Sequence, residues 1–103
     1  MLSFKFEGFP ENIIVRRLIS NIKFILWQFE DCPDSKEIRK ILSKNSIDVI
    51  LMNIDLNDNR KWDLLESYTG YRNVPHLTDV QYQKNINGAE EIKKYLDKQY
   101  SFR

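Results

Sequence analysis

The chain has 103 residues, enough for one hydrophobic core and too few for two. Hydrophobic residues make up 42% of it, which predicts a packed domain rather than a disordered segment. The formal net charge is +1, with acidic and basic residues interleaved, and this argues against a basic nucleic-acid surface and a polybasic membrane patch.

The first third of the chain predicts a strand, a helix and a second strand. Leu2 to Phe6 alternates enough for a short strand, and Glu11 to Asn21 places its isoleucines and a leucine at helical spacing. Lys23 to Phe29 is a near-continuous apolar and aromatic run, typical of a strand that is covered on both faces.

The middle of the chain repeats this alternation. Pro33 suits the first position of a helix that ends near Asn45, because the missing N–H of proline costs nothing there. Asp48 to Leu56 reads as another buried strand. A helix from about Arg60 to Tyr68 follows, with Asn57-Asp58-Asn59 as capping residues and Thr69-Gly70 as its stop.

The last third predicts a hairpin and a closing helix. His76 to Val80 and Gln81 to Ile86 form the hairpin, and Gly88 precedes a helix from Ala89 to Tyr100. The order is therefore β-α-β-α-β-α-β-β-α, in which alternating strands and helices imply parallel pairing and the hairpin adds antiparallel strands. This order predicts an α/β fold, a three-layer α/β/α sandwich around a mixed sheet of four or five strands.

Cysteine and histidine each occur once, as Cys32 and His76. A disulfide within the chain is therefore impossible, which excludes a disulfide-held secreted scaffold and a zinc site of several thiolates. The first residues are broken by charges, unlike a signal peptide, and no segment is long enough to span a membrane. We expect a cytoplasmic protein without a metal, and with neither nucleic acid nor membrane as a partner.

Three motifs in register resemble the glutaredoxin family of the thioredoxin fold. An apolar strand runs into Cys32-Pro33-Asp34-Ser35 and a helix. About forty residues later, Thr69-Gly70-Tyr71-Arg72-Asn73-Val74-Pro75 is similar to the family pattern Thr-Gly-x-x-Thr-Val-Pro, whose proline is cis and faces the active cysteine. Ile86-Asn87-Gly88-Ala89-Glu90-Glu91-Ile92 is similar to the Gly-Gly-x-x-Asp segment that opens the last helix. We interpret residues 1–103 as one domain, with a glutaredoxin-like core at 23–100 and a strand-helix extension at 1–22.

The resemblance implies a set of site residues. Cys32 stands at the position of the active thiol, and Ser35 replaces the second cysteine of a dithiol site. The residues implied in glutathione binding are Pro33, Arg72, Val74, Pro75, Gly88, Glu90 and Glu91. Some have ordinary alternatives: Gly88 as a turn glycine, and the two glutamates as acids that complement the helix dipole. His76 is a candidate proton carrier, but a strand residue without a role is the simpler interpretation.

The chemistry of Cys32 depends on opposing influences. The start of a helix favours a thiolate, the form that attacks disulfides. Glu30, Asp31 and Asp34 oppose it by charge repulsion, and Arg72 and Lys36 are the bases expected near the sulfur. Because a hydroxyl is not a resolving thiol, Ser35 leaves only a monothiol route, although it can donate a hydrogen bond to the thiolate.

Three functions remain open. The first is a glutathione-dependent monothiol oxidoreductase in cell redox homeostasis, a monomer with glutathione as co-substrate and glutathionylated or disulfide-containing proteins as partners. The second is a redox-inactive binding or adaptor domain, its thiol detuned by the acidic neighbours. The third is a glutathione-ligated iron–sulfur carrier, and it ranks last because Pro33 and Asp34 depart from the Cys-Gly-Phe-Ser of those proteins.

Overall fold

The computed structural model describes residues 22–100. Its elements are β1 (Phe24–Gln28), α2 (Pro33–Lys44), β2 (Val49–Asn53), α3 (Asn59–Thr69), β3 (His76–Asp79), β4 (Lys84–Asn87) and α4 (Ala89–Tyr100). Their kinds and order confirm the prediction from residue 23 onward. The strand and helix predicted at Leu2–Phe6 and Glu11–Asn21 lie outside the described residues.

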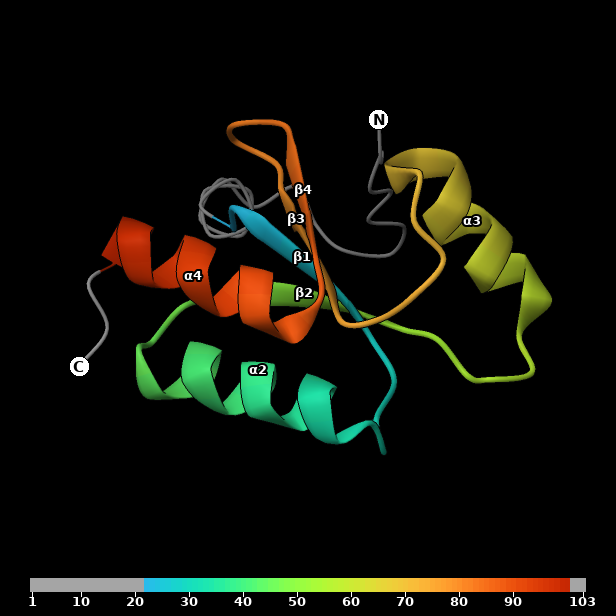
Figure 1. Cartoon of the computed structure of the whole chain (residues 1–103), viewed down its shortest axis with the longest axis horizontal. Helices are drawn as coiled ribbons and strands as arrows, with labels where there is room; N and C mark the ends of the chain where they lie inside the picture. The colour runs from blue at the N-terminus through green and yellow to red at the C-terminus, as the bar shows by residue number, and fades with distance from the viewer. Residues whose placement is uncertain (1–21, 101–103) are drawn as a thin grey trace, which may run out of the picture.

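The described strands form one four-stranded sheet in the order β2-β1-β3-β4 (Figure 1). β1 pairs in parallel with β2, whereas β1 with β3 and β3 with β4 are antiparallel. In this register His76 lies opposite Trp27 of β1 and opposite Asn87 of β4. The end of β1, the start of β3 and the end of β4 therefore lie side by side at one end of the sheet.

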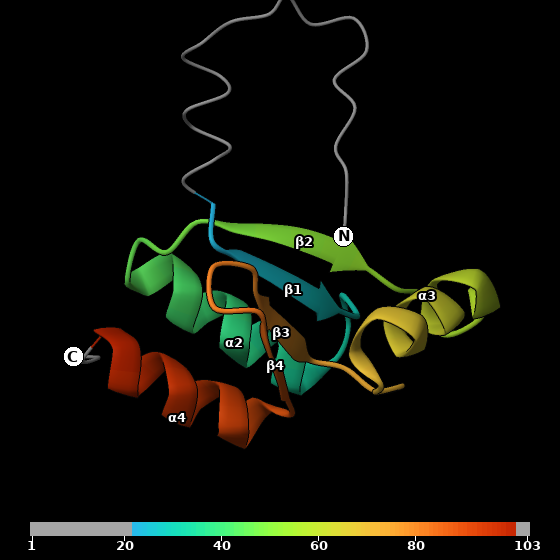
Figure 2. The same cartoon turned by 90° about the horizontal axis from the view of Figure 1, so that it is seen from above.

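The two faces of the sheet carry separate cores, because alternate residues of β1 point to opposite sides. One core joins Phe24 and Leu26 to the buried faces of α2 and α4, and the other joins Ile25 and Trp27 to Leu65 of α3. Figures 1 and 2 show α2 and α4 side by side and α3 apart from them. The described residues thus form the predicted α/β/α layers around a mixed sheet.

Local sequence signals set the helix ends. Pro33 occupies the first turn of α2, as predicted. The Asp58 carboxylate caps α3 by accepting the Lys61 N–H at 3.2 Å. Gly70 ends α3 in the left-handed conformation, with φ at 81°. The sequence chemistry at these three positions therefore defines where the helices begin and end.

Two strand boundaries differ from the prediction by more than one residue. β2 ends at Asn53 rather than Leu56, because the chain turns there and the Asp58 N–H donates to the Asp55 carbonyl at 3.0 Å. The second hairpin strand begins at Lys84 rather than Gln81. Residues 80–83 form the turn instead, where the Asp79 carboxylate accepts the Tyr82 N–H at 3.1 Å.

Replacing the core residue of α3 should destabilise the fold. Leu65 is 0% exposed and is the only residue of α3 that is fully buried, so Leu65→Ala should lower the free energy of unfolding by about 2–5 kcal/mol. Leu56→Ala is the control, because Leu56 is 64% exposed, and it should change stability by less than about 0.5 kcal/mol. Urea unfolding measures both, and equal losses in the two variants would contradict the packing described for α3.

Candidate functional site

Cys32 lies at the N-cap of α2 and is partly exposed. Its backbone is extended, with φ −70° and ψ 121°, and its carbonyl accepts the Lys36 N–H at 3.0 Å. The thiol makes no capping hydrogen bond of its own to the helix. The sulfur is thus attached where the unpaired N–H groups and the positive end of the helix dipole favour an anion.

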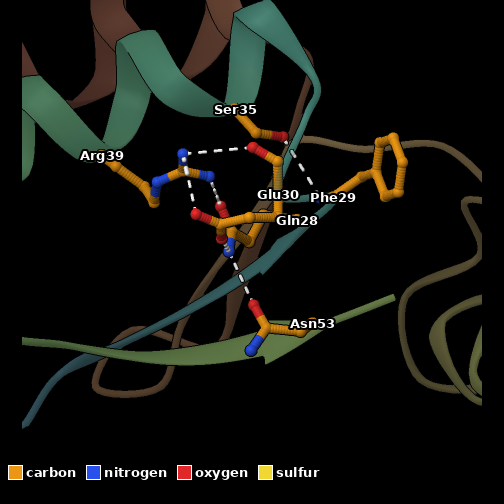
Figure 3. Close-up of polar contacts among 6 residues, drawn as sticks. All are labelled: Gln28, Phe29, Glu30, Ser35, Arg39 and Asn53. Atoms are coloured by element: carbon orange, nitrogen blue, oxygen red, sulfur yellow. Dashed lines mark hydrogen bonds and ion pairs between the residues drawn. The ribbon is translucent and has the colours of Figure 1, made fainter. Parts of the chain in front are cut away.

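The Ser35 side chain is buried beneath the same turn. Its Oγ accepts the backbone N–H of Phe29 at 3.4 Å, which ties the first turn of α2 to the end of β1 (Figure 3). The hydroxyl therefore serves the shape of the loop that carries Cys32. Donation from Ser35 to the Cys32 sulfur stays a prediction.

A polar cluster that was not predicted from the sequence braces this loop (Figure 3). The buried Gln28 side chain donates to Asn53 Oδ1 at 2.6 Å and to Glu30 Oε2 at 3.2 Å, and it accepts a hydrogen bond from Arg39. Arg39 also donates to the Glu30 carbonyl at 3.3 Å and pairs with the Glu30 carboxylate at 3.4 Å. The end of β1, the end of β2 and the middle of α2 are thereby joined, and the cluster includes Glu30, two residues before Cys32 in the sequence.

This cluster changes the expected electrostatics at the thiol. Arg39 pairs with Glu30, one of the three carboxylates expected to repel a thiolate. Asp31 and Asp34 are exposed, and no ion pair within residues 22–100 engages them. Arg72, expected to be near the sulfur, instead pairs with two carboxylates of α3, Asp63 at 2.7 Å and Glu66 at 3.6 Å. Arg39 therefore offsets one of the three carboxylates that were expected to repel the thiolate.

The Val74–Pro75 peptide bond is cis, and Pro75 is buried. The Pro75 carbonyl accepts the Gly88 N–H at 3.0 Å, which joins this segment to the start of α4. Gly88 has φ +90°, a conformation that L side chains rarely adopt, although a Cβ would meet nothing within 4 Å. The glycine is thus required by its backbone, and its N–H already has a partner within the protein.

The two glutamates of the first turn of α4 are exposed and paired with lysines. Glu90 lies 3.2 Å from Lys93, and Glu91 lies 3.6 Å from Lys94. Lys93 also reaches Glu37 of α2 at 2.5 Å, so it links the two helices on this face of the sheet. These ion pairs fit the dipole-complementing role considered for the glutamates. Their contact with a ligand stays a prediction.

His76 follows the cis proline and is fully buried. Its Nδ1 lies 2.9 Å from Asn87 Nδ2, and its Nε2 lies 3.1 Å from Asn85 Oδ1. Burial lowers the pKa of His76 below its ordinary value of 6.5, and the hydrogen bond with Asn85 offsets part of this effect. The simpler interpretation of His76 as a strand residue without a role therefore misses its polar contacts. The alternation Asn85-x-Asn87 opposite a buried strand was the available signal.

The sheet register brings most of the predicted site residues to one end of the sheet. Cys32 follows the end of β1, Pro75 precedes the start of β3 and Gly88 follows the end of β4. Figures 1 and 2 show the start of α2, the segment before β3 and the start of α4 at this end. The side chain of Arg72 is directed to α3 instead.

Comparisons with known proteins define the family. The glutaredoxin family profile matches residues 24–82, more than half of the chain. Among solved structures, wheat glutaredoxin is 17% identical with a TM-score of 0.60, the match covering 82% of this chain and 79% of that one. A thioredoxin-like protein is 18% identical with a TM-score of 0.59, covering 77% and 94%. Comparison with curated protein sequences gives no match.

The glutathione transferases resemble this chain over part of their length. Rice GST1, solved in complex with glutathione, is 21% identical with a TM-score of 0.66, and the match covers 77% of this chain and 34% of that one. The chain therefore spans about a third of that protein. The fold is thioredoxin-like, and with its match over residues 24–82 the chain belongs to the glutaredoxin family. Among the described residues, no helix has the length and hydropathy needed to cross a membrane.

The Glu30 carboxylate, which pairs with Arg39, should slow the reaction of the Cys32 thiol with disulfides. Glu30→Gln should increase the rate at which Cys32 reacts with a disulfide probe at pH 7, by about fivefold if the charge interaction is worth about 1 kcal/mol. Arg39→Met should decrease the rate, because Glu30 then loses its countercharge. Stopped-flow absorbance with an aromatic disulfide measures both, with Glu66→Gln in α3 as the control. A rate that does not change in either variant would show that these charges do not act on the thiol.

The buried histidine should make stability depend on pH. Its lowered pKa means that the unfolded chain binds the proton more readily, so stability falls as pH drops below about 6.5. The loss approaches at most about 1.4 kcal/mol per pH unit until the folded protein also protonates. Urea unfolding from pH 7.5 to 5 in the wild type and in His76→Gln tests this, since carboxylates contribute alike to both. Parallel pH profiles for the two proteins would contradict it.

Proposed function

We propose that the protein is a glutathione-dependent thiol–disulfide oxidoreductase that works by a monothiol mechanism with Cys32 as nucleophile. One observation carries the proposal: in a chain of the glutaredoxin family, the partly exposed Cys32 lies at the N-terminus of α2, at the end of the sheet where the cis Val74–Pro75 segment enters β3. A helix N-terminus stabilises the thiolate that attacks disulfides. The position of Ser35 provides no second thiol.

The proposed cycle exchanges one disulfide for another. The Cys32 thiolate attacks the glutathione sulfur of a glutathionylated protein, so that a Cys32–glutathione disulfide forms and the substrate–glutathione disulfide breaks. The substrate sulfur leaves as a thiolate and takes a proton from solvent. The thiolate of a second glutathione then attacks the bound glutathione sulfur, which releases glutathione disulfide and restores the Cys32 thiolate.

Glutathione would lie along the cis-proline segment and against the start of α4. The backbone of Val74 would pair with the extended tripeptide, and Pro75 would support it from beneath. The N–H groups of the first turn of α4 suit a carboxylate of the ligand. The N–H of Gly88 is not one of these, because it already donates to Pro75. Rice GST1, which shares this fold, is a complex with glutathione, and this supports the choice of ligand.

The remaining assignments follow from this chemistry. We propose glutathionylated or disulfide-containing proteins as partners, a monomeric state and a cytoplasmic location with reduced glutathione at hand. Pro33, Arg72, Glu90 and Glu91 remain proposed glutathione contacts, each now with the ion pairs or helix position described above. The salt bridges of Arg72 to α3 must rearrange for it to reach the ligand.

A redox-inactive binding or adaptor domain is the second candidate. It is favoured by Asp31 and Asp34, two exposed carboxylates beside Cys32 that no ion pair within residues 22–100 neutralises. Like charges disfavour a thiolate and would leave the thiol unreactive. Glutathione binding without turnover is the result that would distinguish this candidate from the oxidoreductase.

The decisive assay is removal of glutathione from a mixed disulfide. With excess glutathione and glutathione reductase, the wild type should accelerate release at least about tenfold over buffer, since activated thiolates gain that much or more over free cysteine. Cys32→Ser should fall to the buffer rate, because a hydroxyl cannot replace the nucleophile. Ser43→Ala, an exposed serine on the same helix, is the control and should keep full activity. Wild-type turnover at the buffer rate would refute the proposal.

A further inference from the structure

A chain of hydrogen bonds runs from the core of the sheet to the cis-proline segment. The Trp27 indole N–H donates to Thr78 Oγ1 at 3.1 Å, and the Thr78 hydroxyl donates to Asn85 Oδ1 at 2.8 Å. The His76 ring is the next member of this series of hydrogen bonds, with Asn85 on one side and Asn87 on the other. Asn87 Nδ2 completes it by donating to the Asn73 carbonyl at 3.2 Å. This series of hydrogen bonds thus ends at Asn73, one residue before Val74.

The partners of His76 define its protonation state. An amide N–H can only donate, so Nδ1 of His76 accepts the bond from Asn87 and carries no proton. The Asn85 oxygen can only accept, so Nε2 carries the proton and donates to it. The imidazole is therefore neutral in a single tautomer, held from both sides by asparagines of β4.

We infer that His76 is a positioning residue for the glutathione site, which it serves in its neutral form by orienting the Asn87 amide so that this amide holds the backbone at Asn73. The inference rests on the proposed function, because it gives His76 a role in the ligand site proposed above. It also assigns a role to Asn87, whose single nitrogen bridges the histidine ring and the loop.

Protonation of the ring would break this arrangement. A proton on Nδ1 would face the Asn87 N–H group, so two donors would oppose each other. Rotation of the Asn87 amide would satisfy the imidazolium, but it would turn the amide oxygen toward the Asn73 carbonyl. Two oxygens would then face each other, and the hydrogen bond to Asn73 would be lost. The segment that leads into Val74 would thus be released at low pH.

The surroundings of His76 contain few charges that could mask this effect. β1 presents the neutral Trp27, and β4 presents two asparagines. From the loop, the Tyr71 ring lies with its centroid 5.4 Å from that of His76. Arg72 beside it is held by two carboxylates of α3, Asp63 and Glu66. Of this set, His76 is the group with an ordinary pKa close to neutral pH, and burial lowers that pKa below 6.5.

The experiment measures the affinity for S-methylglutathione, which has no thiol, by calorimetry at pH 7.0 and pH 5.5. Free α-carboxyl groups titrate well below pH 5 and α-amino groups near pH 8, so the ligand changes little in this interval. Wild-type affinity should drop severalfold at the lower pH. Asn87→Ala should bind weakly at both values and show little pH dependence. Asn85→Ala, the matched variant on the other ring nitrogen, should bind like the wild type at pH 7.0 and show the drop at a lower pH, because the hydrogen bond with Asn85 raises the pKa of His76.

A second measurement works without any ligand. In NMR spectra, the amide signals of Asn73 and Val74 should shift with the titration of the His76 ring in the wild type and stay constant in Asn87→Ala. If the wild type does not bind S-methylglutathione but these amides follow the ring, the proposed glutathione site fails, whereas the coupling of His76 to the backbone at Asn73 through Asn87 stands. If the amides ignore the ring, or if Asn87→Ala binds and titrates like the wild type, the inference is overturned.

Discussion

β3 is held between β1 and β4 by a register in which His76 faces Trp27 on one side and Asn87 on the other. This pairing brings three connections of the chain to one end of the sheet: the turn that carries Cys32, the segment that ends in Pro75, and the entry into α4 at Gly88. A shift of one residue would turn every side chain of β3 to the opposite face. It would also separate the Gly88 N–H from the Pro75 carbonyl. The geometry of the site therefore depends on a backbone register that is set by the two cores.

The same register directs an apolar side chain of β3 to one face of the sheet and polar side chains to the other. Leu77 enters the core against α2 and α4, whereas His76 and Thr78 carry the hydrogen-bond chain on the other face. Burying a series of polar side chains lowers the stability of the fold unless each of them has a hydrogen-bond partner. Among the described residues, every buried side-chain nitrogen and oxygen has one. The network can therefore fix the cis-proline segment without weakening the core beneath it.

The reactivity of Cys32 is the balance of several modest electrostatic effects. The N-terminus of α2 favours an anion, whereas the exposed carboxylates of Asp31 and Asp34 beside Cys32 in the sequence oppose it. Exposed charges interact weakly through water, so the two aspartates act with less strength than their closeness in sequence suggests. The N–H dipoles at the end of a helix are held in place by the backbone, so their effect on the thiol does not depend on side-chain position. Because Arg39 engages Glu30, the opposing charge is smaller than the sequence implies.

Sequence patterns predicted the fold and the backbone of the site well, because those depend on local chemistry. Buried strands, Pro33 at a helix start and Gly70 at a helix end each follow from residue type and neighbours. The polar contacts between side chains were harder to predict from the sequence. Arg39 of α2 reaches Gln28 across eleven residues, and Asn87 reaches Asn73 across fourteen, so both pairings require the packed tertiary structure. Arg72 was expected at the sulfur, but its partners Asp63 and Glu66 on α3 became evident only in three dimensions.

The most direct test of a site that activates Cys32 compares the same thiol with and without the fold. The rate of its reaction with glutathione disulfide is measured at pH 7 in the native protein and in the urea-unfolded chain, where the helix end and the cis-proline segment no longer exist. A working site predicts that the native thiol reacts at least about tenfold faster. A native rate equal to or below that of the unfolded chain would contradict it and favour the adaptor function.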